Sequence, residues 1–278
     1  MSDSNSNPRF ATVASAVSNG TNSFSGEKLK VVGMIPAYNC AHLIKKAYEQ
    51  VPKEYFDSII IVDDGSTDDT LKVAQTLGVK VFTHPHSGYG GNIKYAIRKA
   101  LLLGADYMIE IHGDGQYDPG NIPDAIAKIQ TGQYDFLLGS RFTSLLQPLR
   151  DKMSLVRYLA NLGMSFIDRL VLRIPLTEFH QGFRVYSRRL IETVGLEDTS
   201  DDHLFSFQII AKAAFAKLRV GEIPVRCNYG DEHTSINLRR SVVYAVLTFG
   251  VLAEFLLAKL GFPSKIFRTA KAPEVPAR

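Results

Sequence analysis

Short apolar runs alternate with segments of helical spacing between residues 30 and 139. The run Ser58–Val62 (SIIIV) is continuous and β-branched, which is typical of a parallel strand covered on both faces. Strands are also expected at 30–35, 79–83, 106–111 and 134–139, and helices at 41–50, 67–77, 91–103, 121–130 and 204–216. Because strand and helix alternate five times, the pattern predicts an α/β fold with a mostly parallel central sheet flanked by helices.

The two ends of the chain differ from this alternating region. Residues 1–28 are rich in Ser, Asn, Thr and Ala, and 263–278 are basic, so both are expected to be disordered tails. Residues 239–262 are expected to form an apolar C-terminal helical segment. Glu254 would be costly in the middle of a bilayer, so an in-plane helix at a membrane surface is favoured, with docking against other protein helices as the alternative. The remaining 29–238 are expected to form one domain.

Composition and charge narrow the function classes. The 278 residues carry a formal net charge of +4, without a block of Lys and Arg, so a nucleic-acid partner is not expected. The two cysteines, Cys40 and Cys227, are too few for a disulfide framework and fit a reducing compartment. No basic patch followed by an apolar run begins the chain, so no secretory signal is expected and a cytoplasmic location is predicted.

Polar clusters follow the predicted strands, where open parallel sheets bind their ligands. Asp63 and Asp64 end one strand, and carboxylates there can accept hydrogen bonds from a base or a ribose; helix capping is the alternative for Asp63. The glycine-rich stretch 87–91 would let backbone amides approach a phosphate or ribose, or would form a tight turn. Neither Gly-x-Gly-x-x-Gly nor a P-loop is present, which argues against dinucleotide-binding and P-loop proteins.

The stretch 112–119 (HGDGQYDP) is the most informative of these clusters. It places His112, Asp114 and Gln116 at alternate positions, so in an extended chain they would face one way. A carboxylate, an imidazole and an amide oxygen together suit Mg²⁺ or Mn²⁺, and the imidazole favours Mn²⁺. Such an ion could neutralise charge on a diphosphate leaving group. A polar turn that begins the next helix is the alternative.

Several motifs in a fixed order carry a family resemblance. The series PAYN, VDDGSTD, GYGGN, HGDGQYDP, GSRF and QGFRVYS resembles the family 2 glycosyltransferases of the GT-A fold, over roughly residues 30–237. Within that family it is similar to the branch that contains dolichyl-phosphate mannosyltransferase and related bacterial enzymes. The resemblance implies inverting transfer of a hexose from a UDP- or GDP-sugar to a polyprenyl phosphate or a glycan or glycolipid acceptor. It also implies a divalent metal, Mn²⁺ or Mg²⁺, and work at the inner face of the cytoplasmic membrane.

The resemblance also assigns residues on the donor side. The metal would be held by Asp114, which matches the second aspartate of the family's Asp-x-Asp motif, together with His112 and Gln116. His112 replaces the first aspartate of that motif and removes one negative charge, and Cys40 stands where many members have Glu. The nucleotide would be bound by Pro36, Tyr38, Asn39, Asp63, Asp64, Gly91 and Asn92.

On the acceptor side, Arg184 would hold a phosphate bidentately, with a structural ion pair to Glu178 as the alternative. Asp202, in preference to the aspartate before it, is the expected catalytic base beside Asp114, and helix capping is its alternative. A lipid phosphate is already an anion and needs no strong base. Arg226 and Ser235 lie in a loop that would close over the phosphates, although the lysine that follows this serine in the branch is isoleucine here. Solvated surface is the alternative for Arg226.

Two other functions remain open at this point. A sugar-1-phosphate nucleotidyltransferase would need a glycine-rich, basic signature near the start of the domain, which the PAYN loop lacks. A GT-A-like binding module that has lost catalysis is kept open by His112, because that residue weakens the expected metal site.

Overall fold

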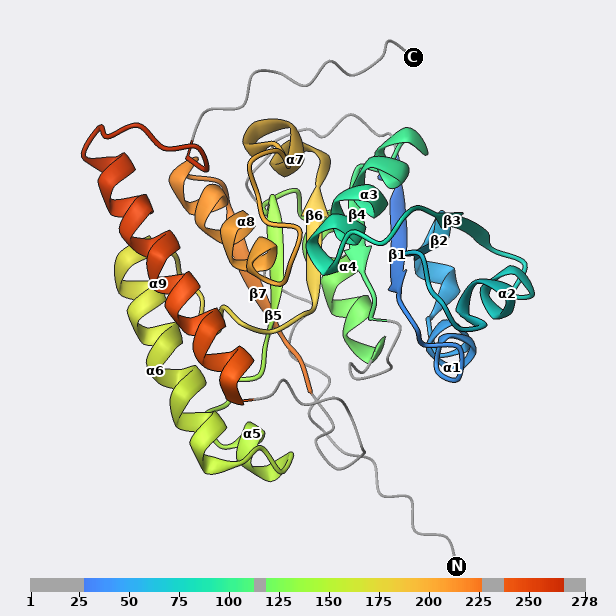
Figure 1. Cartoon of the computed structure of the whole chain (residues 1–278), viewed down its shortest axis with the longest axis horizontal. Helices are drawn as coiled ribbons and strands as arrows, with labels where there is room; N and C mark the ends of the chain where they lie inside the picture. The colour runs from blue at the N-terminus through green and yellow to red at the C-terminus, as the bar shows by residue number, and fades with distance from the viewer. Residues whose placement is uncertain (1–27, 113–118, 227–237, 268–278) are drawn as a thin grey trace, which may run out of the picture.

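The computed structural model describes residues 28–112, 119–226 and 238–267. In these residues seven strands form one sheet, in the order β3-β2-β1-β4-β6-β5-β7 (Figure 1). The strands are β1 (Val31–Ala37), β2 (Ser58–Asp63), β3 (Lys80–Thr83), β4 (Tyr107–Glu110), β5 (Phe136–Ser140), β6 (Arg184–Ser187) and β7 (Val220–Pro224). β6 runs antiparallel to both of its neighbours, β4 and β5, and the other pairs are parallel. The α/β, mostly parallel architecture predicted from the sequence is confirmed.

Helices cover both faces of the sheet. One hydrophobic cluster packs α3, α6, α7, α8 and α9 against one face, and a second packs α1, α2 and α4 against the other. Residues of β1 alternate between them, because successive side chains of a strand point to opposite faces. The helices are α1 (Ile44–Glu49), α2 (Thr70–Gln75), α3 (Tyr89–Leu102), α4 (Ile122–Gln130), α5 (Gln147–Arg150), α6 (Leu155–Leu172), α7 (Arg188–Val194), α8 (Leu204–Phe215) and α9 (Leu238–Lys259), with 3-10 turns η1 (Lys53–Tyr55) and η2 (Pro119–Asn121).

The predicted elements are present with shifted ends, and five more helices and strands accompany them. The helix expected at 67–77 is shortened to α2, because the residues before Thr70 bond to the loop after β1 instead of continuing a helix. Helices α5, α6 and α7 and strands β6 and β7 were not predicted from the sequence. Residues 1–27 and 268–278 of the predicted tails lie outside the described residues. The first part of the second tail, 263–267, is ordered instead, because Phe267 is buried against Phe215 and Phe255.

Pro36 stands in a central strand and has no N–H to donate. The pairing of β1 with β4 ends at Met34, whereas its pairing with β2 continues through Pro36 to Ala37. The last residues of β1 are therefore paired with β2 but not with β4. The missing N–H of Pro36 is tolerated there, because this end of β1 has no partner strand on the side of β4.

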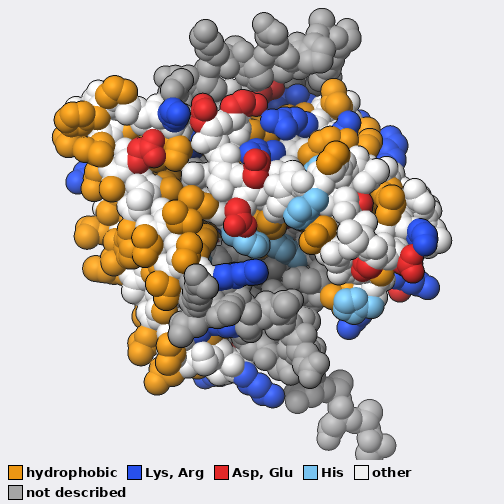
Figure 2. Space-filling model, viewed as in Figure 1, with side chains coloured by type: hydrophobic (Ala, Val, Ile, Leu, Met, Phe, Trp, Pro, Cys, Tyr) orange, Lys and Arg blue, Asp and Glu red, His pale blue; other side chains and the backbone are white. Residues whose placement is uncertain are grey.

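The expected C-terminal helix is α9. It lies beside α6 (Figure 1), and Val251, Leu252 and Phe255 on its inner side are buried. Residues 240–259 are long and apolar enough to cross a membrane, but 22% of the most apolar window is buried against the protein. Side chains of α6 and α9 leave an exposed surface, the apolar helix face, which Figure 2 shows as a broad hydrophobic area over these helices. It comprises Leu155, Val156, Leu159, Phe166 and Leu170 of α6, and Val242, Val243, Val246, Leu247, Leu256 and Leu257 of α9.

Candidate active site

The loops after β1 and β2 are tied together at Asn39. Its φ of 47° is left-handed, a conformation that Asn tolerates better than most residues. Its Oδ1 accepts from the amide of Thr67 at 2.8 Å, and its own amide donates to Ser66 Oγ at 3.0 Å. Asn39, a predicted nucleotide contact, therefore positions the loop that carries Tyr38. The Tyr38 ring is 45% exposed and stacks on His86 at a centroid distance of 4.3 Å.

Asp64 organises the other side of this stack. It is buried, and its carboxylate accepts from the amides of Ser87 at 2.8 Å and Gly88 at 3.1 Å. His86 Nδ1 lies 2.9 Å from Asp64 Oδ2. Asp64 thus fixes the loop that holds His86 beneath Tyr38, which leaves a stacked pair of rings at the end of β1.

Asp63 and Asn92 are buried beside it. Asp63 accepts from Thr83 Oγ1 at 2.9 Å and from the amide of Ser66 at 3.3 Å. Asn92 donates from Nδ2 to the carbonyl of Val62 at 3.2 Å. Both predicted nucleotide residues are thus hydrogen-bonded within the protein, to β2, β3 and the loop after β2. They hold this edge of the sheet together.

The glycine-rich stretch approaches protein backbone. The amide of Gly91 donates to the carbonyl of Asp201 at 3.0 Å. Gly88 has a φ of 86°, and a Cβ on Gly90 would lie 2.6 Å from the carbonyl oxygen of Ser200. The glycines therefore let the start of α3 lie directly against the segment that precedes α8.

A buried carboxylate, Glu110, lies under this junction at the end of β4. It accepts hydrogen bonds from the hydroxyls of Tyr89 at 2.5 Å and Tyr186 at 2.7 Å. Burial, reinforced by the carboxylate, raises the pKa of both tyrosines well above its usual range, so they remain donors. Arg184 stands directly across from Glu110 on β6. Burial lowers the pKa of its guanidinium, but the electrostatic interactions with Tyr89, Tyr186 and Glu110 outweigh that effect and raise it overall.

His112 follows this strand and faces the same cluster. Its Nε2 lies 3.1 Å from the carbonyl oxygen of Gly182 and 3.3 Å from Glu110 Oε1. Tyr89 is stacked between His112, at 6.3 Å, and His203, at 4.7 Å. Figure 2 shows histidine side chains near the middle of this face.

The predicted metal ligands are described only in part. Asp114 and Gln116 lie outside the described residues, and within residues 28–112, 119–226 and 238–267 no group of three or more His, Cys, Asp or Glu side chains could hold an ion. His112 itself fits a ligand, because a metal-binding imidazole ordinarily turns its other nitrogen to a carboxylate or carbonyl, as Nε2 does here.

The expected phosphate-binding arginine, Arg184, is buried at the start of β6. The alternative pairing of Arg184 with Glu178 is wrong, because Glu178 is paired with Arg141, whose Nε lies 2.8 Å from Glu178 Oε1. Arg184 Nη1 donates to the carbonyl of Gly182 at 3.0 Å. Among the described residues, its buried Nε has no hydrogen-bond partner. A guanidinium held in this way retains donor capacity for an anion.

The two aspartates before α8 differ in environment. Asp201 is paired with Lys94, whose Nζ lies 2.6 Å from Oδ1. The side chain of Asp202 is 82% exposed and accepts from the amide of His203 at 2.7 Å. Burial lowers the pKa of His203; Asp202 opposes this, and interactions with His112, Arg240 and Arg184 add to the lowering. Asp202 is therefore the more open of the two carboxylates, and its role as the base stays a prediction.

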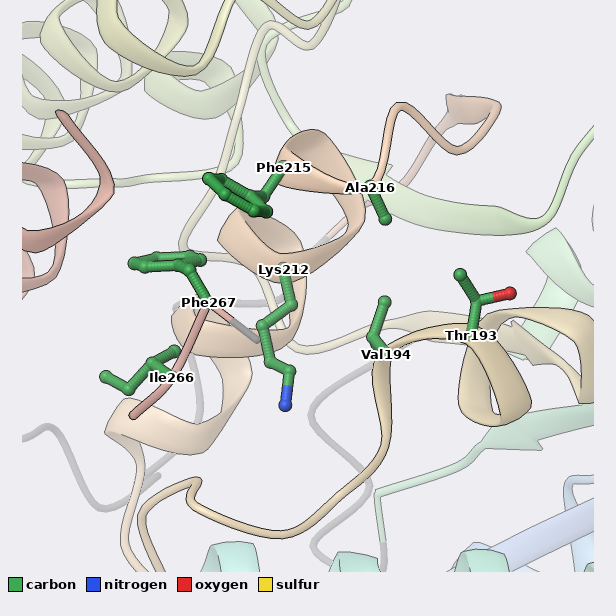
Figure 3. Close-up of a pocket in the computed structure, with 7 residues that line it drawn as sticks. All are labelled: Thr193, Val194, Lys212, Phe215, Ala216, Ile266 and Phe267. Atoms are coloured by element: carbon green, nitrogen blue, oxygen red, sulfur yellow. The ribbon is translucent and has the colours of Figure 1, made fainter. Parts of the chain in front are cut away.

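The last predicted residues lie at the rim. Arg226 is exposed, and its Nη2 lies 2.6 Å from Asp151 Oδ1. Ser235 lies outside the described residues. A pocket of about 130 Å³ at the other end of α8 is lined by Phe215, Ile266 and Phe267 around Lys212 (Figure 3). It is remote from the polar edge, which adjoins the start of α8, and is largely apolar.

Glu110, Tyr89 and His86 were not predicted from the sequence as residues of the site. Glu110 carried a signal, because an acidic residue in an otherwise apolar strand (YMIE) must find partners when that strand is buried. Tyr89 and His86 carried no comparable signal in the sequence, because their roles depend on contacts with distant segments.

Comparison with known proteins assigns this geometry to a family. Residues 34–195, more than half of the chain, match Glycosyl transferase family 2. The chain belongs to this family. It is a glycosyltransferase, as the motif resemblance implied. It is 28% identical over 247 residues to the UDP-N-acetylglucosamine--dolichyl-phosphate N-acetylglucosaminyltransferase of Methanococcus voltae, covering 82% of this chain and 95% of that protein.

Further relatives and solved structures agree. The undecaprenyl-phosphate mannosyltransferase of Micrococcus luteus is 26% identical over 250 residues, covering 84% of this glycosyltransferase and 100% of that protein. Glucosyl-3-phosphoglycerate synthase from Mycobacterium tuberculosis, in complex with UDP, superposes with a TM-score of 0.61 at 18% identity, covering 85% of this chain and 82% of that one. The same enzyme has been solved with Mn²⁺ and UDP, with a TM-score of 0.59. These structures confirm the GT-A fold.

Proposed function

We propose that this glycosyltransferase transfers a hexosyl group from a UDP- or GDP-sugar to a polyprenyl phosphate, with inversion at the anomeric carbon. The observation that carries the proposal is the junction at His180, four residues before Arg184. His180 Nε2 lies 2.9 Å from Asp168 Oδ2 of α6, and Nδ1 lies 3.4 Å from the hydroxyl of Tyr244 on α9. The helices of the apolar helix face thus contact the loop that leads into β6, whose first residue is the candidate phosphate ligand.

The names of two relatives support the choice of acceptor, since both use a polyprenyl phosphate: dolichyl phosphate in one and undecaprenyl phosphate in the other. Family membership favours this activity over the nucleotidyltransferase and the binding-module alternatives.

On the donor side, the Tyr38–His86 stack offers a ring surface to the base, and Asp64 holds that stack in place. A bound Mn²⁺ or Mg²⁺, with His112 as one ligand and Asp114 and Gln116 as the others, would supply positive charge to the departing diphosphate. Within the part of the chain that the structure describes, Arg184 is a candidate to bind phosphate oxygens, because it is a buried guanidinium whose Nε has no hydrogen-bond partner there.

On the acceptor side, the chemistry needs little proton transfer. A phosphate oxygen that attacks the anomeric carbon is already anionic, so Asp202 would be needed as a base only if a hydroxyl of a glycan or glycolipid were the acceptor. Arg226 and Ser235 would contribute to phosphate binding from the rim. Loss of Asp202 therefore distinguishes the two acceptor classes: activity with a lipid phosphate should persist, and activity with a hydroxyl acceptor should be lost.

The apolar helix face would place the enzyme on the cytoplasmic side of a membrane. One side of α9 packs on the protein, so the helix would lie in the plane of the interface and not cross it. Glu254, the charge that disfavoured a spanning helix, accepts from Ser264 Oγ at 2.6 Å. Phe166 and Leu170 of α6 are 68% and 67% exposed, one turn apart, and would enter the lipid together.

Vesicle flotation tests this membrane contact. The double variant Phe166→Ser with Leu170→Ser should bind anionic vesicles at least tenfold more weakly than the unmodified protein. Leu102→Ser is the matched control, because Leu102 is 70% exposed but lies at the end of α3, outside the apolar helix face. Equal vesicle binding by all three proteins would refute the contact.

An acceptor-dependent assay tests the transfer. The purified protein would receive UDP-Glc, UDP-GlcNAc, UDP-Gal or GDP-Man, with Mn²⁺, Mg²⁺ or EDTA, and with or without undecaprenyl phosphate in detergent. We expect one donor to release its nucleotide, dependent on both the metal and the lipid phosphate. Nucleotide release that does not depend on the lipid would contradict the proposed acceptor. Nucleotide release that persists fully in EDTA would contradict the proposed metal.

A further inference from the structure

His112 replaces the acidic residue that the family motif has at this position, and another acidic residue, Glu110, lies next to its ring. Glu110, two residues earlier, is fully buried. A buried carboxylate is retained only when its oxygens are bonded and its charge is balanced, and both conditions are met here. The two tyrosine hydroxyls donate to it, and Arg184 stands across the strand pair.

We infer that Glu110 is a positioning residue for the metal: together with the Gly182 carbonyl it fixes the tautomer of His112, and it makes the imidazole a stronger metal ligand. This inference rests on the proposed metal-assisted transfer.

The tautomer follows from the acceptors around one nitrogen. His112 Nε2 lies 3.1 Å from the carbonyl oxygen of Gly182 and 3.3 Å from Glu110 Oε1. Neither atom can donate, so Nε2 must carry the hydrogen. In the neutral ring the lone pair is then on Nδ1, which becomes the nitrogen able to ligate an ion. The stack of Tyr89 on the imidazole, at an interplanar angle of 18°, further restricts the orientation of the ring.

The same contact between His112 and Glu110 affects how strongly the imidazole binds a metal. A carboxylate behind a ligating imidazole makes that imidazole a stronger donor to the metal, and loss of such a partner typically costs 10- to 100-fold in metal affinity. Tyr89 supports both groups, because its hydroxyl donates to Glu110 while its ring covers His112. Glu110 therefore affects the ion through the imidazole, without itself contacting the donor.

The test is a double-mutant cycle of Mn²⁺ affinity. Mn²⁺ binding would be measured by electron paramagnetic resonance, with and without UDP, for the unmodified protein, Glu110→Gln, His112→Asn and the double variant. We expect Glu110→Gln to weaken Mn²⁺ binding by at least tenfold in the presence of His112. In the His112→Asn background the same change should have less than a threefold effect, because the imidazole through which it acts is gone.

Tyr186→Phe is the matched control. It also removes a hydrogen bond to Glu110, at Oε2, but leaves the carboxylate and its contact with His112. It should lower thermal stability as Glu110→Gln does and leave Mn²⁺ affinity within threefold. If Tyr186→Phe weakens Mn²⁺ binding as much as Glu110→Gln does, the effect is a general loosening of the core and the inference is wrong.

A spectroscopic measurement on the metal-free protein gives a second test. In ¹⁵N-detected histidine spectra, the signal that disappears in His112→Asn should have the Nε2–H pattern in the unmodified protein, and Glu110→Gln should shift it toward a mixture of tautomers. An Nδ1–H pattern in the unmodified protein would overturn the inference. If the unmodified protein binds no Mn²⁺ in either condition, the proposed metal fails and the inference with it. Normal binding with an unchanged Glu110→Gln variant overturns the inference alone.

Discussion

The contact between α3 and the segment before α8 can be tested with one methyl group. A Cβ on Gly90 would lie 2.6 Å from the carbonyl oxygen of Ser200, 2.7 Å from that of Asp202 and 2.7 Å from Phe205 Cβ. All three atoms belong to rigid parts of the chain, so the two segments must move apart by several tenths of an ångström. Gly90→Ala should therefore destabilise the fold and displace the start of α3.

The magnitude is a balance of two effects. Replacing a helical glycine by alanine favours the helix by up to about 1 kcal/mol. Overpacking a rigid contact costs roughly 1–3 kcal/mol. We expect a net loss of about 1–2 kcal/mol in the free energy of unfolding, measured by urea denaturation with an unchanged m-value. Because Tyr89 adjoins Gly90 and bonds to Glu110, binding of the nucleotide sugar should also weaken.

Gly163→Ala is the matched control. Gly163 is an exposed helical glycine in α6, and a Cβ there would meet nothing within 4 Å. This variant should gain about 0.5–1 kcal/mol from helix propensity, without an effect on nucleotide binding. If Gly90→Ala proves as stable as Gly163→Ala, the close approach of α3 to residues 200–202 is wrong, and with it the explanation of the glycine-rich motif.

Four further substitutions, at three residues, test the polar and charged groups of the interior. Arg184→Gln should lower the free energy of unfolding by about 3–5 kcal/mol in urea titrations, because it leaves Glu110 buried without its cation; Arg184→Lys should cost less. His180→Ala should cost about 2–4 kcal/mol, because burial already raises the pKa of Asp168 and the variant removes its hydrogen-bond partner; a cost below ~0.5 kcal/mol would contradict this. Burial raises the pKa of Asp135, but hydrogen bonds from its arginine partner outweigh that and lower it overall. The ionised, paired carboxylate therefore stabilises the fold at any pH above 3.8, the pKa of the unfolded group. At pH 7 the unmodified protein should be more stable than Asp135→Asn by about 1 kcal/mol. This advantage should disappear as the pH falls below 3.8 and through the lower pKa of the folded state. An advantage that stays constant from pH 7 to pH 3 in thermal melts would refute this linkage.

The sequence predicted those elements whose pattern is set by burial on both faces. β2 is continuous and β-branched, and its predicted start at Ser58 agrees with the structure. β6 could not be predicted in this way, because its four residues, RVYS, include a charged and a polar residue. In the fold, Arg184 stands opposite Glu110 in the strand register, and the Tyr186 hydroxyl donates to the same carboxylate. That meeting depends on an antiparallel pairing between strands more than seventy residues apart.

The candidate site shows the same division. The positions of Asp63, Asp64 and His112 at strand ends followed from the alternation of elements, since parallel strands place their carboxyl ends at one edge. What these side chains contact did not follow. The sequence could not show that Asp64 binds the amides of Ser87 and Gly88, because the loop after β3 comes into reach only when β2 and β3 pair.

α6 was missed although its apolar and polar positions contrast more strongly than those of α8, which the sequence did predict. Its outward-facing apolar side chains form part of the apolar helix face. A helix whose periodicity was readable from the sequence is thus one of the two that support the proposed contact with lipid.

The most direct measurement of the central claim is mass spectrometry of the lipid product. The unmodified protein would be incubated with the active nucleotide sugar, Mn²⁺ and undecaprenyl phosphate, and the extracted lipid would be analysed for an added hexosyl group and its anomeric configuration. The account predicts a single sugar joined to the lipid phosphate, with the configuration opposite to that of the donor. Unmodified lipid alongside released nucleotide, or a retained configuration, would contradict it.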